Sequence, residues 1–268
     1  MAPHNGVRLK GQETVAEAGP AINPIEQFEL SRILRVIVGH SDVSLTNSAI
    51  FMAIAAGLTL LLMAQTAKGT VGAPGRLQSL GEMAYEFVAG MVKSSAGEQG
   101  MRFFPLVFSI FMFILFCNLV GIIPYTFTPT SHIVITAALA LTVFFTVIIV
   151  GLMEHGTHFF KLFVPEGVQW FLMPIVVPIE IISFFSRPLS HSIRLFANML
   201  AGHIILNVFG GFVAMLLAAS AVLKILALLP FVMTIGLEAL ELLVAFLQAY
   251  VFAMLTCMYL NDALHPGH

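Results

Sequence analysis

The chain has 268 residues, of which 59% are hydrophobic and only 10% are charged, and its formal net charge at pH 7 is −2. In an average soluble protein about a quarter of the residues are charged, so this composition excludes a soluble protein whose entire surface is exposed to water. Most of the surface is expected to face lipid, and the near-neutral charge gives no electrostatic basis for binding nucleic acid.

The N-terminal region is more polar than the rest of the chain. Residues 1–24 contain Gly and Pro, which predicts a tail without fixed structure. Residues 25–38 mix apolar and basic side chains, which predicts a short helix lying on the lipid headgroups. We therefore divide the chain into a tail with an interfacial helix, 1–45, and a polytopic membrane domain, 46–268.

The first membrane helix is predicted over residues 48–64, which carry no charge. As a helix this stretch is about 26 Å long, close to the shortest length that crosses a hydrocarbon core. In residues 77–92, apolar side chains alternate with charged ones. This pattern is typical of an amphipathic helix at a membrane surface or against other helices.

Residues 103–153 contain no Asp, Glu, Lys or Arg, and Pro124 and Pro129 interrupt them. The interruption predicts two membrane helices, 103–123 and 132–153, joined by a tight turn. We expect this uncharged hairpin to act only as a scaffold.

Two longer apolar stretches follow, 168–218 and 221–262. As continuous helices they would be about 76 and 63 Å long, roughly twice what a bilayer requires. Either prolines such as Pro188 and Pro230 break them, or each helix is strongly tilted along a partner. The predicted fold is an all-α integral membrane protein with about five membrane helices and one amphipathic helix, the last two being long and tilted.

Basic residues in the predicted loops favour one orientation. Those that would share one side of the membrane are Lys68, Arg76, Lys93, Arg102 and Lys161. That side is expected to be cytoplasmic, or matrix in a mitochondrion. Basic residues before the first membrane helix oppose this assignment.

Charged and titratable side chains concentrate in 168–262, in contrast to the charge-free hairpin before it. An arginine or carboxylate near the bilayer centre costs about 2.5–3.5 kcal/mol on insertion scales, and such residues usually line a pathway or pair with each other. The other interpretation is an ion network that only holds two helices together. The residues within the predicted helices are Glu180, Arg187, His191, Arg194, His203, Glu238 and Glu241. Lys224 and Asp262 are expected at membrane edges, as ordinary interface residues.

Helical spacing separates Arg194 from His203. Glu180, Arg187 and Arg194 are seven residues apart, so each step returns to within about 20° of the same side. His203 follows Arg194 by nine residues, which places it about 180° away. A pathway that used both sides would consist of two offset routes separated by a positive charge.

Polar residues flank these positions. Ser190 and Asn198 stand four residues before and after Arg194, hence beside it on the helix. Glu241 and Gln248 are seven residues apart and share one face of the second long helix.

The segment SRPLSHSIRLFANMLAGH, residues 186–203, closely resembles the signature of subunit a of F-type ATP synthases. The segment ELLVAFLQAY, residues 241–250, is similar to the same family. The resemblance covers most of the chain from about residue 45, and its Arg-Leu-Phe-x-Asn-Met core is highly specific. It implies a non-catalytic, ion-translocating subunit that has no cofactor, no metal and no catalytic site of its own.

The resemblance also implies roles for single residues. Arg194 matches the essential arginine that faces the rotor ring. His203 and Glu241 match the paired positions of the proton inlet, and Glu180 matches an acidic position of the outlet. In one branch of the family the acid and the histidine are exchanged, so this chain has the mitochondrial-like order. The polar neighbours of this site are Asn198, Gln248, Ser190 and His191.

The mechanism implied is proton translocation through two offset half-channels, which couples the proton-motive force to ring rotation and ATP synthesis. The partners implied are the c-ring, the peripheral-stalk b subunits, the rest of the ATP synthase and the lipid bilayer. The expected location is the bacterial inner membrane, with the mitochondrial inner membrane as the alternative.

Two other classes of membrane protein fit the sequence less well. A haem or quinone subunit needs histidines that face each other from different helices, whereas His191 and His203 share one predicted helix. A secondary transporter usually contains internal repeats, and none is evident. His155 and His158 are two potential ligands in a predicted loop, which is too few for a metal centre.

Overall fold

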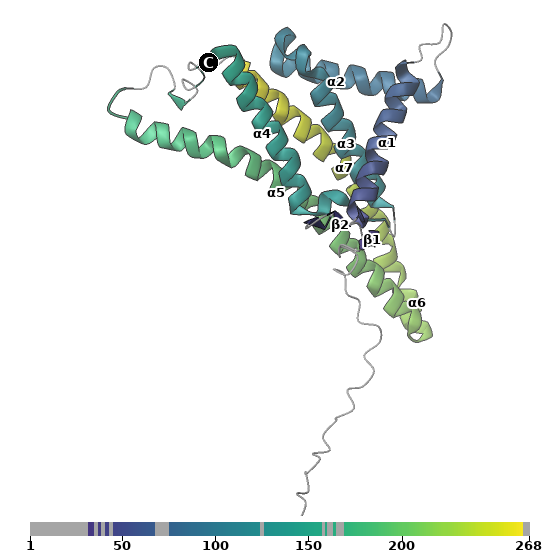
Figure 1. The fold of residues 1–268 in the computed structure, drawn as a ribbon. Helices are drawn as coiled ribbons and strands as arrows, with labels where there is room; N and C mark the ends of the chain where they lie inside the picture. The colour runs from purple at the N-terminus through teal and green to yellow at the C-terminus, as the bar shows by residue number, and fades with distance from the viewer. Residues whose placement is uncertain are drawn as a thin grey trace, which may run out of the picture.

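Figure 1 shows the computed structural model of the chain, which is helical over most of its length. The residues that it describes are 32–34, 37–38, 41–42, 45–67, 75–123, 126–156, 159, 163–164 and 169–264. The helices are α1 (Asn47–Ala67), α2 (Arg76–Gly100), α3 (Phe104–Ile122), α4 (Ile133–His155), α5 (Met173–Ala218), α6 (Ala221–Leu226) and α7 (Leu228–Leu264). Two short 3-10 turns are η2 (Met101–Phe103) and η3 (Pro129–Ser131).

Long apolar helices confirm the predicted fold class, an all-α integral membrane protein. Within the described ranges, 5 stretches are long and apolar enough to cross a membrane. They are Asn47–Thr66, Arg76–Ile122, Ile133–His155, Met173–Ala218 and Leu223–Leu264. Helices satisfy their own backbone hydrogen bonds, which is what a lipid environment demands of a spanning segment.

The amphipathic helix predicted over 77–92 is part of α2, which lies across one end of the bundle in Figure 1. Val88, Met91 and Val92 are buried, and Glu82 and Glu86 on the other side are exposed. This arrangement confirms the amphipathic pattern. A kink at Gly97, whose φ is 66°, then redirects the chain towards α3. Only glycine adopts this backbone region without strain.

The predicted charge-free hairpin is confirmed as α3 and α4. Pro105 stands in the first turn of α3, where its missing N–H has no intrahelical partner to lose. At the other end of α3, the Thr126 hydroxyl lies 2.5 Å from the carbonyl oxygen of Val120 and 2.6 Å from that of Ile123, and it can donate its one proton to either. The backbone N–H groups of Ile123 and Thr126 also donate to these two carbonyls, so the end of the helix is capped.

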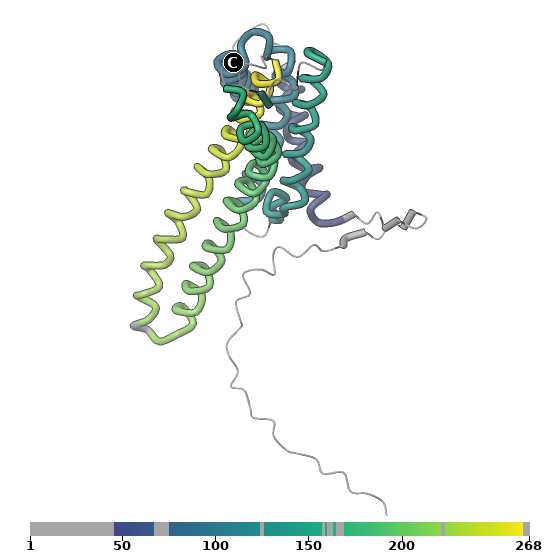
Figure 2. Tube along the Cα trace, turned by 90° about the vertical axis from the view of Figure 1, so that its left-hand side faces the viewer, coloured from purple at the N-terminus to yellow at the C-terminus, as the bar shows by residue number. Residues whose placement is uncertain are grey.

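The two long stretches form a helical hairpin, α5 to α7, that leans across the bundle (Figures 1 and 2). Helix α5 has 46 residues, which corresponds to about 69 Å. It runs without a break through Pro178 and Pro188, so tilt rather than interruption accommodates its length. Pro230 falls in the first turn of α7, where proline is tolerated.

Helix α7 holds the bundle together because it packs along α3, α5, α2 and α4. Fully buried side chains from α3, α5 and α7 meet there, among them Phe111, Leu195, Met199 and Phe252. The distal part of the hairpin, around α6, extends away from α1, α3 and α4 in Figure 2. Most of its side chains are exposed, which suits contact with lipid or another subunit.

The prediction of an interfacial helix over residues 25–38 is wrong for 32–34 and 37–38, the part of this range that the structure describes. Strands β1 (Arg32–Leu34) and β2 (Ile37–Val38) lie there instead. They pair antiparallel with β4 (Leu45–Thr46) and β3 (Ser41–Asp42), respectively. The stretch RILRVIV is rich in β-branched residues, which favour strands over helices. The predicted tail, residues 1–24, lies outside the described residues.

Candidate functional site

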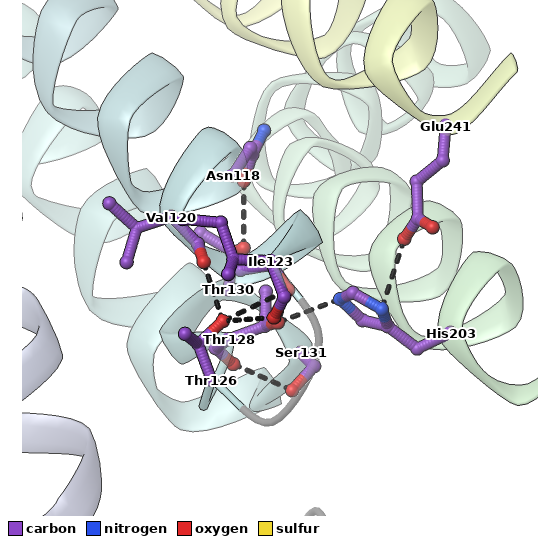
Figure 3. Close-up of polar contacts among 10 residues, drawn as sticks. Asn118, Val120, Ile123, Thr126, Thr128, Thr130, Ser131, His203 and Glu241 are labelled. Carbon is purple, nitrogen blue, oxygen red and sulfur yellow. Dashed lines mark hydrogen bonds and ion pairs between the residues drawn. The ribbon is translucent and has the colours of Figure 1, made fainter. Parts of the chain in front are cut away.

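The centre of the site is a buried pair of titratable side chains, His203 on α5 and Glu241 on α7. His203 Nδ1 lies 3.1 Å from Glu241 Oε1, and the two side chains are only 9% and 4% exposed. Figure 3 shows the two side chains facing each other between the helices. Gly202 leaves room for the carboxylate, since a Cβ there would stand 3.0 Å from Glu241 Oε1.

The turn between α3 and α4 contributes a third polar side chain beside this pair. Thr128 Oγ1 lies 2.7 Å from the other ring nitrogen of His203, Nε2 (Figure 3). Neutral His203 protonated at Nδ1 can accept a hydrogen bond from Thr128 at Nε2. The Nδ1–Glu241 contact is close, but neither carboxylate oxygen of Glu241 has a hydrogen-bond partner among the described residues. The three side chains form one polar cluster that connects the α3–α4 turn with α5 and α7.

Asn118 fixes the turn against α7. Its Nδ2 donates to the carbonyl oxygen of Ala245 at 3.3 Å, and its Oδ1 accepts a hydrogen bond from Thr130 Oγ1 at 2.7 Å. Ser131 Oγ donates to the carbonyl oxygen of Thr128 at 2.7 Å. The turn predicted to act only as a scaffold thus contributes directly to the polar site. Asn118 is the only amide side chain within residues 103–153, a signal that sequence reasoning missed.

His132 borders the same turn, just before the first residue of α4. Its ring stacks on Phe127, with centroids 5.0 Å apart and planes inclined by 18°. Partial burial lowers the pKa of His132 below its ordinary value. This residue is therefore neutral near pH 7 and adds no fixed charge beside the site.

Arg194 lies on the opposite, open side of α5. It is exposed, whereas His203 is buried, as the predicted angle of about 180° requires. Arg194 makes no ion pair with any residue in the described ranges. Beside it, Asn198 Nδ2 donates to Gln248 Oε1 at 2.8 Å, which links the two long helices. The arrangement offers a permanent cation to something outside this chain.

Arg187 behaves differently from Arg194, although the spacing places both on one side of α5. Its Nη1 donates to Asp262 Oδ2 on α7 at 2.8 Å. The guanidinium also lies over the ring of Tyr259, 5.2 Å from the centroid. Asp262, expected to be an ordinary interface residue, is therefore half of an ion pair between the long helices. This contact is an ion pair between two helices, the kind of contact that the alternative interpretation of the charges expected.

The remaining predicted site residues lie elsewhere along α5. His191 is 2% exposed and packs against Phe252, with ring centroids 4.0 Å apart. It lines a small, partly open pocket between α4, α5 and α7 that Arg187 also borders. Ser190 is exposed and Glu180 is half-buried near the start of α5, so neither is brought into the His203–Glu241 pair.

Histidines outside the pair take other positions. His155 Nε2 lies 2.9 Å from the carbonyl oxygen of Leu264, at the end of α7. His158 lies outside the described residues. Where side chains are described, no three His, Cys, Asp or Glu residues gather as a metal ion would need.

Comparison with known proteins agrees with this geometry. The family model of the ATP synthase A chain matches residues 47–261. The ATP synthase subunit a of Bradyrhizobium diazoefficiens is 57% identical over 249 residues, which cover 92% of this chain and 99% of the relative. That of Mesorhizobium japonicum is 57% identical over 251 residues, covering 94% and 100%. That of Chelativorans sp. is 58% identical over 250 residues, covering 92% and 100%. Since the matched range contains both the His203–Glu241 pair and the open Arg194 side, the chain belongs to the ATP synthase subunit a family.

Proposed function

We propose that this chain is the proton-translocating stator subunit of an ATP synthase. Protons pass through two offset half-channels at its interface with a ring of c subunits, and their flow drives ring rotation and ATP synthesis. The observation that carries the proposal is the division of α5 into two sides. The buried His203–Glu241 pair lies on one side, and an exposed arginine without an ion-pair partner among the described residues lies on the other.

The inlet uses the path from Thr128 through His203 to Glu241. A proton that arrives at the α3–α4 turn is taken up by the imidazole and handed to the carboxylate, 3.1 Å away. Both groups lie at membrane depth, where ionisable residues are costly and usually serve transport. From Glu241 the proton passes to a carboxylate on a ring helix. The neutralised ring carboxylate can then turn into lipid.

Arg194 separates the inlet from the outlet. Its guanidinium stays charged in a protein, whereas a lysine at this depth can lose its proton. A fixed positive charge favours the ionised form of a passing carboxylate, so the ring releases its proton there. The same charge repels a proton that would otherwise cross directly between the half-channels. Ala197 and Ala201 are exposed beside it and allow a ring helix to approach closely.

Glu180 marks the outlet. It precedes Arg194 by two seven-residue steps, about 21 Å along α5, and is half-buried. A carboxylate at this distance towards the other membrane surface can receive the released proton and pass it to water. A proton driven through 100 mV releases about 2.3 kcal/mol, so several protons are needed for each ATP.

The partners follow from this role. They are the c-ring at the Arg194 side, peripheral-stalk b subunits elsewhere, and the rest of the ATP synthase. The relatives compared come from bacteria, which supports the plasma membrane as the location.

The test replaces Arg194 by alanine in the complete ATP synthase. Proton-driven ATP synthesis in membrane vesicles is expected to fall below detection, because nothing then forces the ring carboxylate to release its proton. The amount of assembled complex should stay near the wild-type level, since the side chain is exposed and makes no internal ion pair. Normal synthesis by the Arg194→Ala enzyme would overturn the proposal.

Cysteine cross-linking tests the ring interface separately. A cysteine at Ala201, exposed on the Arg194 side, should form a disulfide with a cysteine on the outer helix of the ring. A cysteine at Leu60 on α1, which is 66% exposed, is the control and should not cross-link to the ring. Equal cross-linking at both positions would contradict the assigned face.

A further inference from the structure

Two arginines stand on nearly the same side of α5, yet only one is available to a partner. Arg187 and Arg194 are separated by seven residues, which is about 10.5 Å along the helix and about 20° around it. Arg194 is exposed and forms no ion pair in the part of the chain that the structure describes. Arg187 is engaged with α7. The difference cannot come from helix geometry, so it comes from what α7 supplies opposite each arginine.

What α7 supplies to Arg187 is Asp262. The contact is a charge-assisted hydrogen bond of 2.8 Å, and the side chains are 26% and 39% exposed. The guanidinium carbon of Arg187 also lies over two aromatic rings, 5.2 Å from the centroid of Tyr259 and 5.8 Å from that of Phe184. Rings attract a cation but do not cancel its charge. Asp262 is therefore the group that neutralises Arg187.

A carboxylate partner is the only means of removing this charge, because a guanidinium does not lose its proton in a protein. Without Asp262, α5 would present a second positive charge about two helical turns from Arg194. A ring carboxylate would then have two places at which its ionised form is stabilised. Proton release would no longer be confined to one position along the rotor path.

We propose that Asp262 masks Arg187, so that Arg194 is the single unpaired cation that α5 offers to the ring. Asp262 and Arg187 are thus positioning residues that restrict where the ring carboxylate ionises. This inference rests on the proposed function, because it requires a ring carboxylate to pass along α5. The competing explanation is a clasp, in which the ion pair only holds the end of α7 against α5.

Charge removal distinguishes the two explanations. Asp262→Asn keeps an oxygen that can accept the hydrogen bond but leaves Arg187 charged. We expect ATP-driven proton pumping by the complete enzyme to fall by about tenfold, as a change of about one pKa unit at the ring carboxylate would produce. ATP hydrolysis should fall less, so that fewer protons are pumped for each ATP.

The decisive variant is the double substitution Arg187→Gln with Asp262→Asn. It removes the clasp completely, yet it also removes the unmasked cation. Masking predicts that pumping by the double variant returns to within about twofold of wild type. It also predicts that Arg187→Gln alone pumps equally well, since Arg194 is then the only arginine on α5. A double variant as impaired as Asp262→Asn, or an equally impaired Arg187→Gln, would establish the clasp and overturn masking.

Controls separate failure of this inference from failure of the proposed function. Glu154→Gln breaks another ion pair, Arg102–Glu154 at 2.7 Å, whose two residues belong to neither α5 nor α7, and should leave pumping unchanged. Arg194→Ala is measured in the same preparations. If it abolishes pumping while Asp262→Asn pumps normally, only masking is refuted. If Arg194→Ala pumps normally, the proposed function itself is refuted. Subunit content of each purified complex shows whether assembly is intact.

Discussion

The two sides of α5 differ in where their polar groups find partners. On the inner side, His203 is held by Thr128 from the α3–α4 turn and by Glu241 from α7. On the open side, Arg194 has no ion-pair partner among the described residues, and beside it Asn198 is bonded to Gln248. Both carboxylate oxygens of Glu241 are nevertheless buried without a hydrogen-bond partner among the described residues, and such groups are costly. In the proposed function, a ring carboxylate from another subunit is the partner of the open side.

The difference between the two sides predicts what a substitution on each side would disturb. Changes on the inner side disturb a proton path whose members lie on three separate segments, whereas changes on the open side disturb recognition of a partner. Arg187 combines features of both sides. Its spacing from Arg194 places it near the open side of α5, but its charge is paired within this chain, with Asp262. Three further predictions sharpen this comparison on the inner side.

The largest effect is expected from loss of either member of the inner pair. His203→Ala or Glu241→Ala breaks the path between Thr128 and the ring, so ATP synthesis in vesicles should fall to a few per cent or below, about 2 kcal/mol or more in barrier. The exchanged variant, with glutamate at 203 and histidine at 241, restores both groups in reverse order. It should retain clearly more synthesis than either single variant. Equal damage in all three would contradict a shared relay.

A smaller effect is expected from Thr128→Val, which keeps the side-chain shape but removes the hydroxyl that contacts His203 Nε2 at 2.7 Å. A buried hydrogen bond contributes about 1 kcal/mol, so the initial rate of ATP-driven proton pumping should fall about fivefold. Thr142→Val is the matched control. Thr142 is exposed on α4, and its hydroxyl bonds only to the Ala138 carbonyl of its own helix. Similar rates for the two variants would exclude Thr128 from the path.

The smallest effect is expected from Gly202→Ala. The added methyl would stand 3.0 Å from Glu241 Oε1 and 3.3 Å from its Cδ, so the carboxylate must shift by a few tenths of an ångström. Proton pumping should fall about twofold, a cost below 1 kcal/mol. Gly57→Ala on α1, where the new methyl meets no atom within 4 Å, should have no effect. A normal rate for Gly202→Ala would show that the carboxylate position is not restricted there.

Much of the fold follows from the sequence because lipid makes helix formation a local requirement. Charge-free runs of sufficient length predicted α1, α3 and α4, and the separation of Arg194 from His203 followed from 100° of rotation per residue. The strands near residues 32–46 were not anticipated, although the β-branched residues of this stretch are a local signal that favours strands. The signature around Arg194 was enough to indicate the family.

What the sequence by itself determined was therefore the set of helices, their membrane character and the side of α5 on which each titratable residue stands. Only the tertiary structure decided which residues meet: Thr128 with His203, and Arg187 with Asp262, each pair 75 residues apart. It also decided that α5 continues through Pro188. The physical reason is that periodicity is local, whereas a partner across a helix interface depends on how whole helices cross and slide.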